Sequence, residues 1–401
     1  MEEKNKNYSK TLITNEIILT SEFETGNGRD FKEYDKDIFG FYPEKDSTDL
    51  YSSPAYYFKF KIENRLLKKQ DTKKITITAI ADDDKRGWEQ FIGTKIWKYN
   101  LNGSIEQLNP KNTKPTLYSI GINLELKPKE KFFVSNMITI PYSEMKEKIL
   151  DLCTIYPSNI KIEEIGKSPM GNSIYSLKLH PHENIWNESS KIKILISGSP
   201  QPSEFGDFAA LNLLKMYLNK GEGFWNELKE YFKFQFIFFQ NPDGIVYGKN
   251  MTNSKGENIF FSYNLEQNNL PQECEFVWEF IKKEPPDLYL EIHSYSQFKK
   301  TIRPYIYPYE LLKSDVRKRI YKKLSKELVS FSNGAVEKIK LNEKWFSNTL
   351  AYQLQKNFDT LSFQYKLHSN LRLEENWKII WNVFEKVIKN LRKLKIELRR
   401  N

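Results

Sequence analysis

The sequence predicts an α/β fold: a mixed, mostly parallel sheet flanked by helices, preceded by an N-terminal antiparallel β-sandwich domain. Two observations lead to this prediction. Over residues 1–140, short apolar runs with alternating polarity are separated by turn residues. From residue 141 onward, apolar runs alternate with segments that have the period of a helix. We therefore expect two domains, residues 1–140 and residues 141–401.

The N-terminal domain is predicted from four β-runs rich in β-branched and aromatic residues. These runs are Ile17–Thr20, Ala55–Ile62, Lys74–Ile80 and Phe132–Ile140. Their spacing is typical of an antiparallel sandwich. The basic loop Asn109–Pro115 contains two prolines, and we expect it to be the mobile element of this domain.

The second domain is predicted to begin with a helix, because Met145, Ile149 and Leu152 recur on one helical face. A further helix is expected over Phe208–Leu218, between apolar runs that have the length of buried strands. These runs are Ile174–Leu179, Ile192–Ile196 and Phe234–Phe239. Strands that alternate with helices favour a parallel arrangement at the centre of the sheet.

The composition is that of a globular protein, with 39% hydrophobic and 14% aromatic residues among 401. The first twenty residues lack an apolar stretch, and no window approaches eighteen uninterrupted apolar residues. We therefore expect a cytoplasmic protein without a membrane partner. The two cysteines, Cys153 and Cys274, have no Cys-x-x-Cys spacing, which excludes a thiolate zinc site and suits a reducing compartment.

The formal net charge of +10 is mostly dispersed, and the exception is the basic segment Lys386–Arg400. Its apolar residues fall at helical spacing: Val387, Leu391, Leu394 and Leu398. A closing helix with a solvated outer face is favoured over an arm for nucleic acid or membrane, because no RNA-binding or Gly-rich phosphate motif accompanies it. We expect no nucleic-acid partner.

Four short motifs follow one another in the second domain. They are Ile165–Gly171 (Ile-Gly-Lys-Ser-Pro-Met-Gly), Gln201–Glu204 (Gln-Pro-Ser-Glu), Asn241–Gly244 (Asn-Pro-Asp-Gly) and Asp287–Ser294 (Asp-Leu-Tyr-Leu-Glu-Ile-His-Ser). In order and spacing they resemble the motifs of the M14 zinc carboxypeptidases. In addition, Ser21–Asn27 (Ser-Glu-Phe-Glu-Thr-Gly-Asn) resembles the opening of the cytosolic carboxypeptidase-like subgroup, in which a β-sandwich precedes the peptidase domain.

The resemblance implies a zinc ion held by a His-x-x-Glu motif and a later histidine. At those positions this chain has Gln201, Glu204 and His293. An amide oxygen is a poor zinc donor beside imidazole, so we expect weak zinc binding at most and no other cofactor. Glu204 and His293 could equally persist as a buried, charge-assisted pair without metal. A literal His-x-x-Glu at residues 180–183 follows an earlier strand and is interpreted as a solvated turn.

The resemblance also implies residues that bind substrate and activate water. Met251 stands at the position of a substrate-binding arginine, and Phe260 and Phe261 at those of an Asn-Arg pair. Neither Met nor Phe can donate a hydrogen bond to a carboxylate. The position of the catalytic glutamate falls on Ser362, or on Gln364 if the strand shifts by two, and neither is a base near neutral pH.

The joint replacement of these groups favours a catalytically degenerate metallocarboxypeptidase-like protein, a pseudoenzyme. Its former cleft, lined by Met251, Phe260 and Phe261, would bind a peptide or protein segment. The alternative is a divergent enzyme of the same family that acts on a peptide or acyl substrate with altered or residual zinc chemistry. Hydrogen-bond contact between Ser362 and His293 would support that alternative, because it would form a nucleophilic pair.

Overall fold

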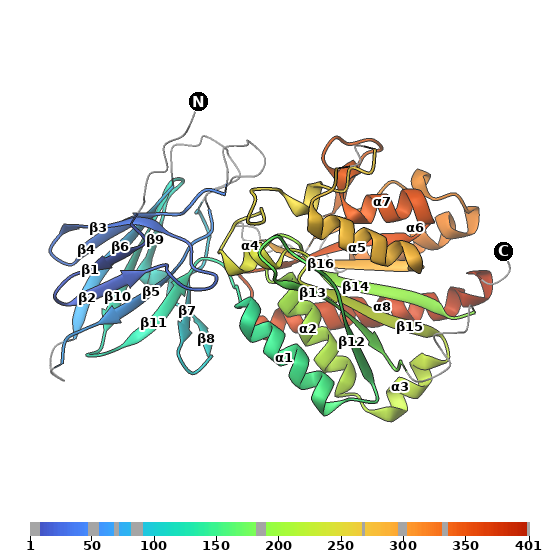
Figure 1. Ribbon diagram of the computed structural model, residues 1–401, viewed down its shortest axis with the longest axis horizontal. Helices are drawn as coiled ribbons and strands as arrows, with labels where there is room; N and C mark the ends of the chain where they lie inside the picture. The colour runs from blue at the N-terminus through green and yellow to red at the C-terminus, as the bar shows by residue number, and fades with distance from the viewer. Residues whose placement is uncertain are drawn as a thin grey trace.

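The computed structural model describes residues 9–46, 56–67, 72–81, 91–181, 190–266, 269–295, 303–330 and 336–398. In Figure 1 the described chain forms a β-domain beside a larger domain of helices and strands. The strands-only part ends with β11 at Ser135, and the first α-helix begins at Tyr142. The predicted fold class is confirmed: a mixed α/β domain preceded by a domain of mainly antiparallel sheets.

The N-terminal domain consists of two sheets that enclose an aromatic core. The first sheet has the order β1 (Thr11–Ile13), β2 (Ile17–Thr20), β5 (Lys59–Asn64), β11 (Lys131–Ser135), β7 (Trp97–Asn100) and β8 (Ile105–Gln107). The second has the order β3 (Arg29–Asp35), β4 (Ile38–Tyr42), β6 (Lys73–Ile80), β10 (Ser119–Leu126) and β9 (Thr113–Pro115). Its β4 and β6 are parallel, whereas the other described pairs of this domain are antiparallel.

The segment expected to be a mobile loop, residues 109–115, is instead built into the second sheet. Its 3-10 turn η1 (Pro110–Asn112) starts at Asn109, whose side chain accepts a hydrogen bond from the backbone N–H of Lys111. The residues after the turn form β9, which pairs with β10. Local capping and edge pairing therefore order a segment that its composition alone marks as a loop.

The second domain is organised around an eight-stranded mixed sheet. Its order is β12 (Ile160–Lys167), β13 (Ser173–Leu179), β15 (Phe232–Phe238), β14 (Ile192–Gly198), β16 (Leu288–Tyr295), β19 (Leu361–His368), β17 (Arg303–Ile306) and β18 (Glu337–Lys338). The four central strands β15, β14, β16 and β19 are parallel to one another. Antiparallel pairs join this centre to the flanking strands, so the predicted mixed sheet with a parallel centre is confirmed.

Helices pack against both faces of this sheet (Figure 1). They are α1 (Tyr142–Ile155), α2 (Gly206–Leu218), α3 (Glu222–Lys229), α4 (Pro242–Val246), α5 (Gln272–Lys283), α6 (Asp315–Ser330), α7 (Leu350–Phe358) and α8 (Leu373–Leu398). The described residues of this domain also form the short 3-10 turns η3 (Ile259–Phe261), η4 (Tyr309–Leu311) and η5 (Phe346–Asn348). No helix in the described part of the chain is long and apolar enough to cross a bilayer.

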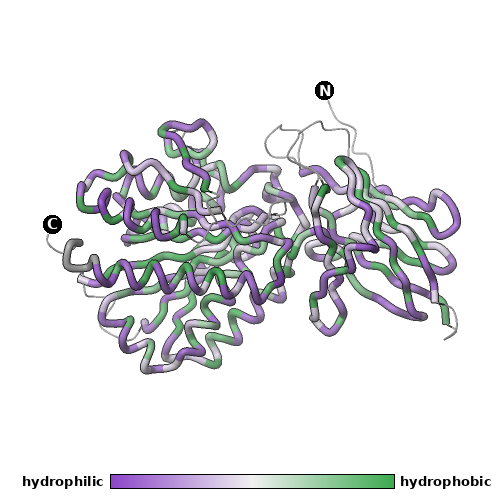
Figure 2. Tube along the Cα trace, turned by 180° about the vertical axis from the view of Figure 1, so that it is seen from behind, coloured by the Kyte–Doolittle hydropathy of each residue, from purple (hydrophilic) through white to green (hydrophobic). Residues whose placement is uncertain are grey.

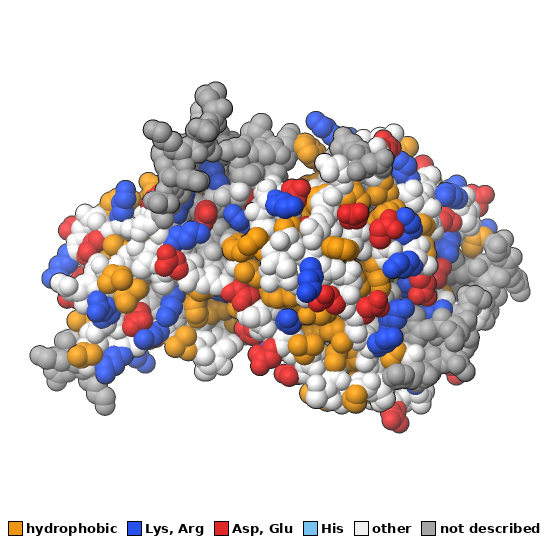
Figure 3. Space-filling model, in the orientation of Figure 1, with side chains coloured by type: hydrophobic (Ala, Val, Ile, Leu, Met, Phe, Trp, Pro, Cys, Tyr) orange, Lys and Arg blue, Asp and Glu red, His pale blue; other side chains and the backbone are white. Residues whose placement is uncertain are grey.

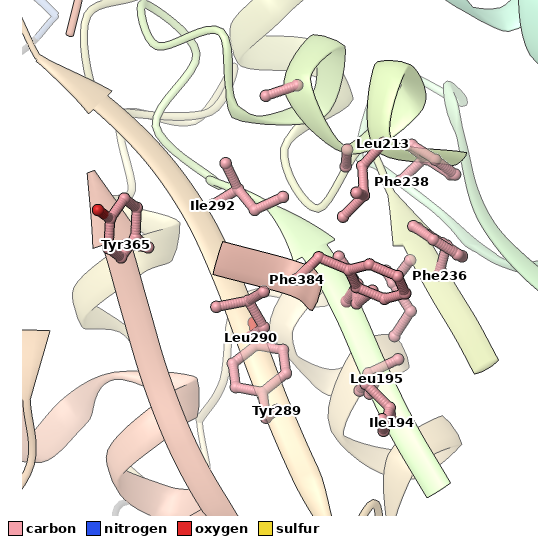
Figure 4. Close-up of a cluster of buried hydrophobic side chains, with 14 of the residues drawn as sticks. Ile194, Leu195, Leu213, Phe236, Phe238, Tyr289, Leu290, Ile292, Tyr365 and Phe384 are labelled. Atoms are coloured by element: carbon pink, nitrogen blue, oxygen red, sulfur yellow. The ribbon is translucent and has the colours of Figure 1, made fainter. Parts of the chain in front are cut away.

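Successive side chains of β16 alternate between the hydrophobic core and the polar site. Leu290 and Ile292 face α2 and α8, and Figure 4 shows them beside Leu213 and Phe384 of those helices. In Figure 2 the strands of the sheet carry most of the green, hydrophobic colour, whereas the outer sides of the helices are purple. Because side chains of a strand alternate, Tyr289, Glu291 and His293 must face the opposite side. One strand therefore supplies both a core face and a site face.

The motif Ser21–Asn27 forms the joint between the two domains. The backbone N–H of Thr25 donates to the carbonyl of Val246 over 3.2 Å, and Asn27 Nδ2 donates to the carbonyl of Gly248 over 2.8 Å. The Glu24 carboxylate accepts the backbone N–H of Ser143 over 2.8 Å, in the first turn of α1. Since α1 has no side-chain cap of its own, Glu24 supplies one from the other domain.

The tightest point of this joint predicts a stability difference between two glycine variants. Gly248 has φ +61°, and an added Cβ would lie 2.1 Å from the carbonyl oxygen of Gly26. Gly103 has φ +84° with no atom within 4 Å of an added Cβ. Alanine at either position carries left-handed strain of about 1–2 kcal/mol. Gly248→Ala must also push the domains apart, so we expect its melting temperature to fall clearly further than that of Gly103→Ala. Equal losses in thermal melts would contradict a close contact between the domains.

Candidate active site

The predicted metal positions come together at the carboxyl ends of two parallel strands. Gln201 and Glu204 lie in the turn between β14 and α2, and His293 lies near the end of β16. His293 Nδ1 is 2.9 Å from Glu204 Oε2 and 3.2 Å from Gln201 Oε1. The backbone N–H of Ser294 also donates to Glu204 Oε2 over 2.9 Å. This is the edge at which open α/β sheets place their sites.

Lys366 completes the group, and the sequence analysis did not select it. The register of β16 and β19 pairs His293 with Lys366, whose Nζ lies 3.2 Å from Glu204 Oε1. The sequence pattern of β19 could have pointed to Lys366, because Ser362, Gln364 and Lys366 share one strand face. Only the register between the two strands shows that Lys366 is the member of this set that reaches Glu204.

A second carboxylate, Glu291, lies on the other side of the imidazole. Its Oε2 is 3.1 Å from His293 Nε2, which is ion-pair distance although the geometry is not that of a hydrogen bond. Glu291 also accepts hydrogen bonds from Tyr289 Oη over 2.9 Å and from Gln364 Nε2. The His293 side chain has no exposed surface, so its ring stands between two buried carboxylates.

These contacts set the charges of the group. Burial lowers the pKa of His293, but the two carboxylates outweigh it and hold that pKa above its ordinary value. Burial by itself would raise the pKa of Glu204. The nearby Lys366 and His293 outweigh this effect and lower the pKa to about 2. Glu204, Glu291, His293 and Lys366 are here called the ion cluster. It places two carboxylates beside the Lys366 ammonium group and a histidine whose protonated form these carboxylates favour.

The residues present do not fit a zinc ion. Zinc requires deprotonated ligands, whereas the surroundings of His293 favour the protonated ring. The second oxygen of Glu204 already faces the ammonium group of Lys366, and Gln201 adds only a neutral amide oxygen. Among the described residues, no three His, Cys, Asp or Glu side chains are grouped in a way that could hold a metal ion.

Neither position predicted for the catalytic glutamate supplies a base or nucleophile. Ser362 is buried, pairs with Tyr289 in the strand register, and its Oγ has no hydrogen-bond partner in the described structure. It lies four residues before Lys366 on β19, which is roughly 13 Å along a strand. Ser362 and His293 therefore form no hydrogen-bonded pair. Gln364 lies nearer, but its amide nitrogen donates to Glu291.

Aromatic side chains cover the ion cluster where the resemblance implies substrate-binding groups. Phe260 is 3% exposed and its ring lies edge-on to His293 at 5.0 Å. Phe261 is partly buried and contacts Trp345 and Phe346, with ring centres 6.1 and 5.7 Å away. Tyr305 stacks on Phe346, and Lys366 Nζ lies 5.5 Å from the Tyr305 ring centre. We call these five side chains the aromatic cover.

Met251 lies beneath the surface, in a loop that the N-terminal domain holds. Its side chain is only 6% exposed. Asp46 accepts backbone N–H groups from Asn250 over 2.7 Å, Met251 over 2.6 Å and Thr252 over 2.9 Å. In addition, Tyr56 Oη lies 2.9 Å from Ser203 Oγ, within the Gln201–Glu204 turn. The β-domain thus fixes part of the site's frame.

His180 and His368 lie apart from the ion cluster. His180 is buried with Nε2 3.2 Å from Tyr217 Oη, so the prediction of a solvated turn is wrong for this residue. Packing against α2 covers it, and His182 and Glu183 lie outside the described residues. His368 is buried and accepts the backbone N–H of Asn370 over 2.9 Å, which is a structural role.

Comparisons with known proteins agree with this architecture. Residues 145–268 match the model of the zinc carboxypeptidase family Peptidase_M14. No curated protein matches the chain by sequence.

Solved structures share the fold over both domains. A metallo-carboxypeptidase from Burkholderia cenocepacia aligns with a TM-score of 0.76 and 13% identity, over 94% of this chain and 99% of that one. A metallo-carboxypeptidase from Pseudomonas aeruginosa, in complex with (2-guanidinoethylmercapto)succinic acid, aligns with a TM-score of 0.73 and 14% identity, over 95% of this chain and 99% of that one. Residues 145–268 are therefore similar to the zinc carboxypeptidase family Peptidase_M14, and the chain shares the two-domain fold of these metallo-carboxypeptidase structures.

Proposed function

We propose that this chain is a catalytically degenerate metallocarboxypeptidase-like protein, a pseudoenzyme that binds a peptide or protein segment and does not hydrolyse it. One observation carries the proposal: the ammonium group of Lys366 lies on Glu204, beside a histidine held between two carboxylates. The negative charge that would attract a metal ion is thereby compensated from within the chain.

The chemistry around this ion cluster supports the same proposal. A hydrolase of this type needs a metal-bound water, a base to activate it and donors for the developing oxyanion. Ser362 and Gln364 provide no base, and Met251 and Phe260 provide no donor. Since Ser362 also forms no hydrogen bond with His293, the divergent-enzyme alternative lacks the nucleophilic pair that would support it.

The aromatic cover supports a binding role at the former cleft. Phe261, Trp345 and Phe346 are each partly buried, so part of each ring remains accessible. An apolar or aromatic side chain of a peptide could stack there, whereas a terminal carboxylate would find hydrophobic surface. The free thiols of Cys153 and Cys274 support a reducing, cytoplasmic compartment for this role.

The first prediction concerns metal content. Gln201→His alone restores an imidazole but leaves the Lys366 ammonium group on Glu204, so we expect no stoichiometric zinc. Gln201→His combined with Lys366→Gln removes that cation, and we expect uptake of about one zinc ion per chain. Elemental analysis after dialysis against zinc measures both variants. A wild-type chain that holds one zinc ion and releases C-terminal residues from peptides would overturn the proposed function.

A second prediction concerns the pH dependence of stability. The pKa of Glu204 is lowered to about 2, so its contribution is present above the unfolded value of about 4.3 and is lost as pH falls toward 2. The pKa of His293 is raised, so its contribution is present below about 6.5 and is lost as pH rises through the raised value. We expect the melting-temperature gap between wild type and Glu204→Gln to be largest near pH 5–6 and to narrow towards pH 2.

The matched control for this measurement is Glu163→Gln, at an exposed position of β12. It removes a carboxylate charge outside the ion cluster and should change the melting temperature little at both pH 2 and pH 6. A gap for Glu204→Gln that does not vary between pH 2 and pH 6 would show that Glu204 is not ion-paired.

A third prediction concerns peptide binding at the aromatic cover. A short peptide with an internal Phe or Trp should bind the wild type, and Phe261→Ala should weaken binding about tenfold because a stacking surface is lost. Tyr118→Ala removes an exposed aromatic ring of the β-domain and serves as the control. Calorimetric titration gives the three affinities, and equal values would contradict binding at the former cleft.

A further inference from the structure

A second surface feature lies apart from the ion cluster, at the junction of the two domains. It is a groove of about 870 Å³. Its walls are the segment Ser21–Gly26 of the β-domain, one face of α1 and the end of α4. None of the residues of the ion cluster or the aromatic cover lines it. In Figure 3 hydrophobic and acidic side chains lie close together along this boundary between the domains.

The floor of the groove is apolar and accessible. Phe23, Leu150, Val246 and Tyr247 line it, and Leu150 and Tyr247 are 41% and 44% exposed. Single exposed apolar residues are ordinary on protein surfaces, but a hollow that gathers several of them is typical of a binding site. The joint between the domains creates this hollow, because its residues come from both.

The sides of the groove are acidic although the whole chain has a net charge of +10. Its acidic lining residues are Glu22, Glu24, Glu147 and Asp151, and its basic ones are Lys10 and Lys146. Lys10 forms an ion pair with Glu44 at 2.7 Å, so its charge is already compensated.

Glu147 and Asp151 are two acidic residues of the groove that lie close together on α1 without an ion-pair partner in the described part of the chain. They are four residues apart on α1, where two like charges destabilise a helix by about 0.2–0.5 kcal/mol. Neither has an ion-pair partner among the described residues, whereas Glu144 on the same helix is paired with Lys148 at 3.3 Å. Asp151 interacts with Lys215 at longer range, and Lys146 is the remaining cation of the lining. The acidic side chains still outnumber the basic ones, so the groove presents net negative charge beside its apolar floor.

We propose that this groove binds a basic peptide segment of a partner protein. An apolar side chain of the peptide would rest on Phe23, Leu150 and Tyr247, and flanking Lys or Arg side chains would face Glu147 and Asp151. The lining of α1 from Tyr142 to Asp151 is roughly 14 Å long at 1.5 Å per residue, which matches about four residues of extended peptide. Charge complementarity selects a basic segment, and the inference does not rest on the proposed function.

The test uses two blocked peptides as probes, Lys-Leu-Lys-Phe-Lys and its counterpart Glu-Leu-Glu-Phe-Glu, titrated calorimetrically into the full chain. We expect the basic peptide to bind at least tenfold more tightly, and its affinity to fall as salt rises from 50 to 300 mM, because the charges are exposed. The double variant Glu147→Lys with Asp151→Lys should weaken it at least tenfold. Glu310→Lys, an exposed charge reversal on η4 outside the groove, should leave the affinity unchanged.

Leu150→Ala provides a second variant that keeps the charges and shortens the apolar floor, and it should weaken the basic peptide several-fold. Circular dichroism melts establish that each variant is folded. Equal affinity for the two peptides, or an affinity that the double variant leaves intact, would overturn the proposal. So would sedimentation that shows a dimer of the chain abolished by the double variant, because the groove would then hold a second copy.

Discussion

The contact on which the site depends is the part-buried ion pair between Lys366 and Glu204. Glu204 is held at the turn after β14, and Lys366 reaches it from β19, two strands away across β16. Because His293 lies between the same carboxylate and Glu291, each charge in the ion cluster depends on the others. Removal of one partner would leave the other charge without its counter-ion in a place with little access to water. The ion cluster therefore ties together three central strands at their carboxyl ends.

The aromatic cover and the loop from residue 250 to 261 follow from this arrangement. Phe260 packs on His293, and its apolar ring limits the access of water to the ion cluster. A drier surrounding strengthens the attraction between the paired charges. The N-terminal domain contributes through Asp46, which binds three successive backbone N–H groups of the loop that carries Met251. The β-domain is thus part of the frame of the site and is not a separate appendage.

The joint between the domains has a second consequence besides support of the site. The short segment that caps α1 through Glu24 and contacts Gly248 also forms one wall of the groove at the junction. The charges of the ion cluster are largely shielded from solvent, whereas Glu147 and Asp151 of the groove are exposed. The molecule therefore has one shielded group of paired charges and one accessible acidic surface.

Much of the fold could be predicted from the sequence, because periodicity is a local property. The strand Ile17–Thr20, the helix through Met145, Ile149 and Leu152, and the alternation of strands and helices after it all appear in the structure. The spacing of four motifs was sufficient to indicate the family, since turns at strand ends keep their order along the chain. The same motifs also predicted that Gln201, Glu204 and His293 belong to one site.

The role of Lys366 could not be predicted, because it depends on the register between strands that are distant in the sequence. A shift of β19 by two residues would keep its polar face and place Gln364 opposite His293 instead. Likewise, only packing buries His180 against Tyr217 and lets Glu24 cap a helix of the other domain. The sequence by itself determined the elements, their order and the loss of the expected ligands. The tertiary structure decided which charges meet, because ion pairing depends on distances that no local pattern encodes.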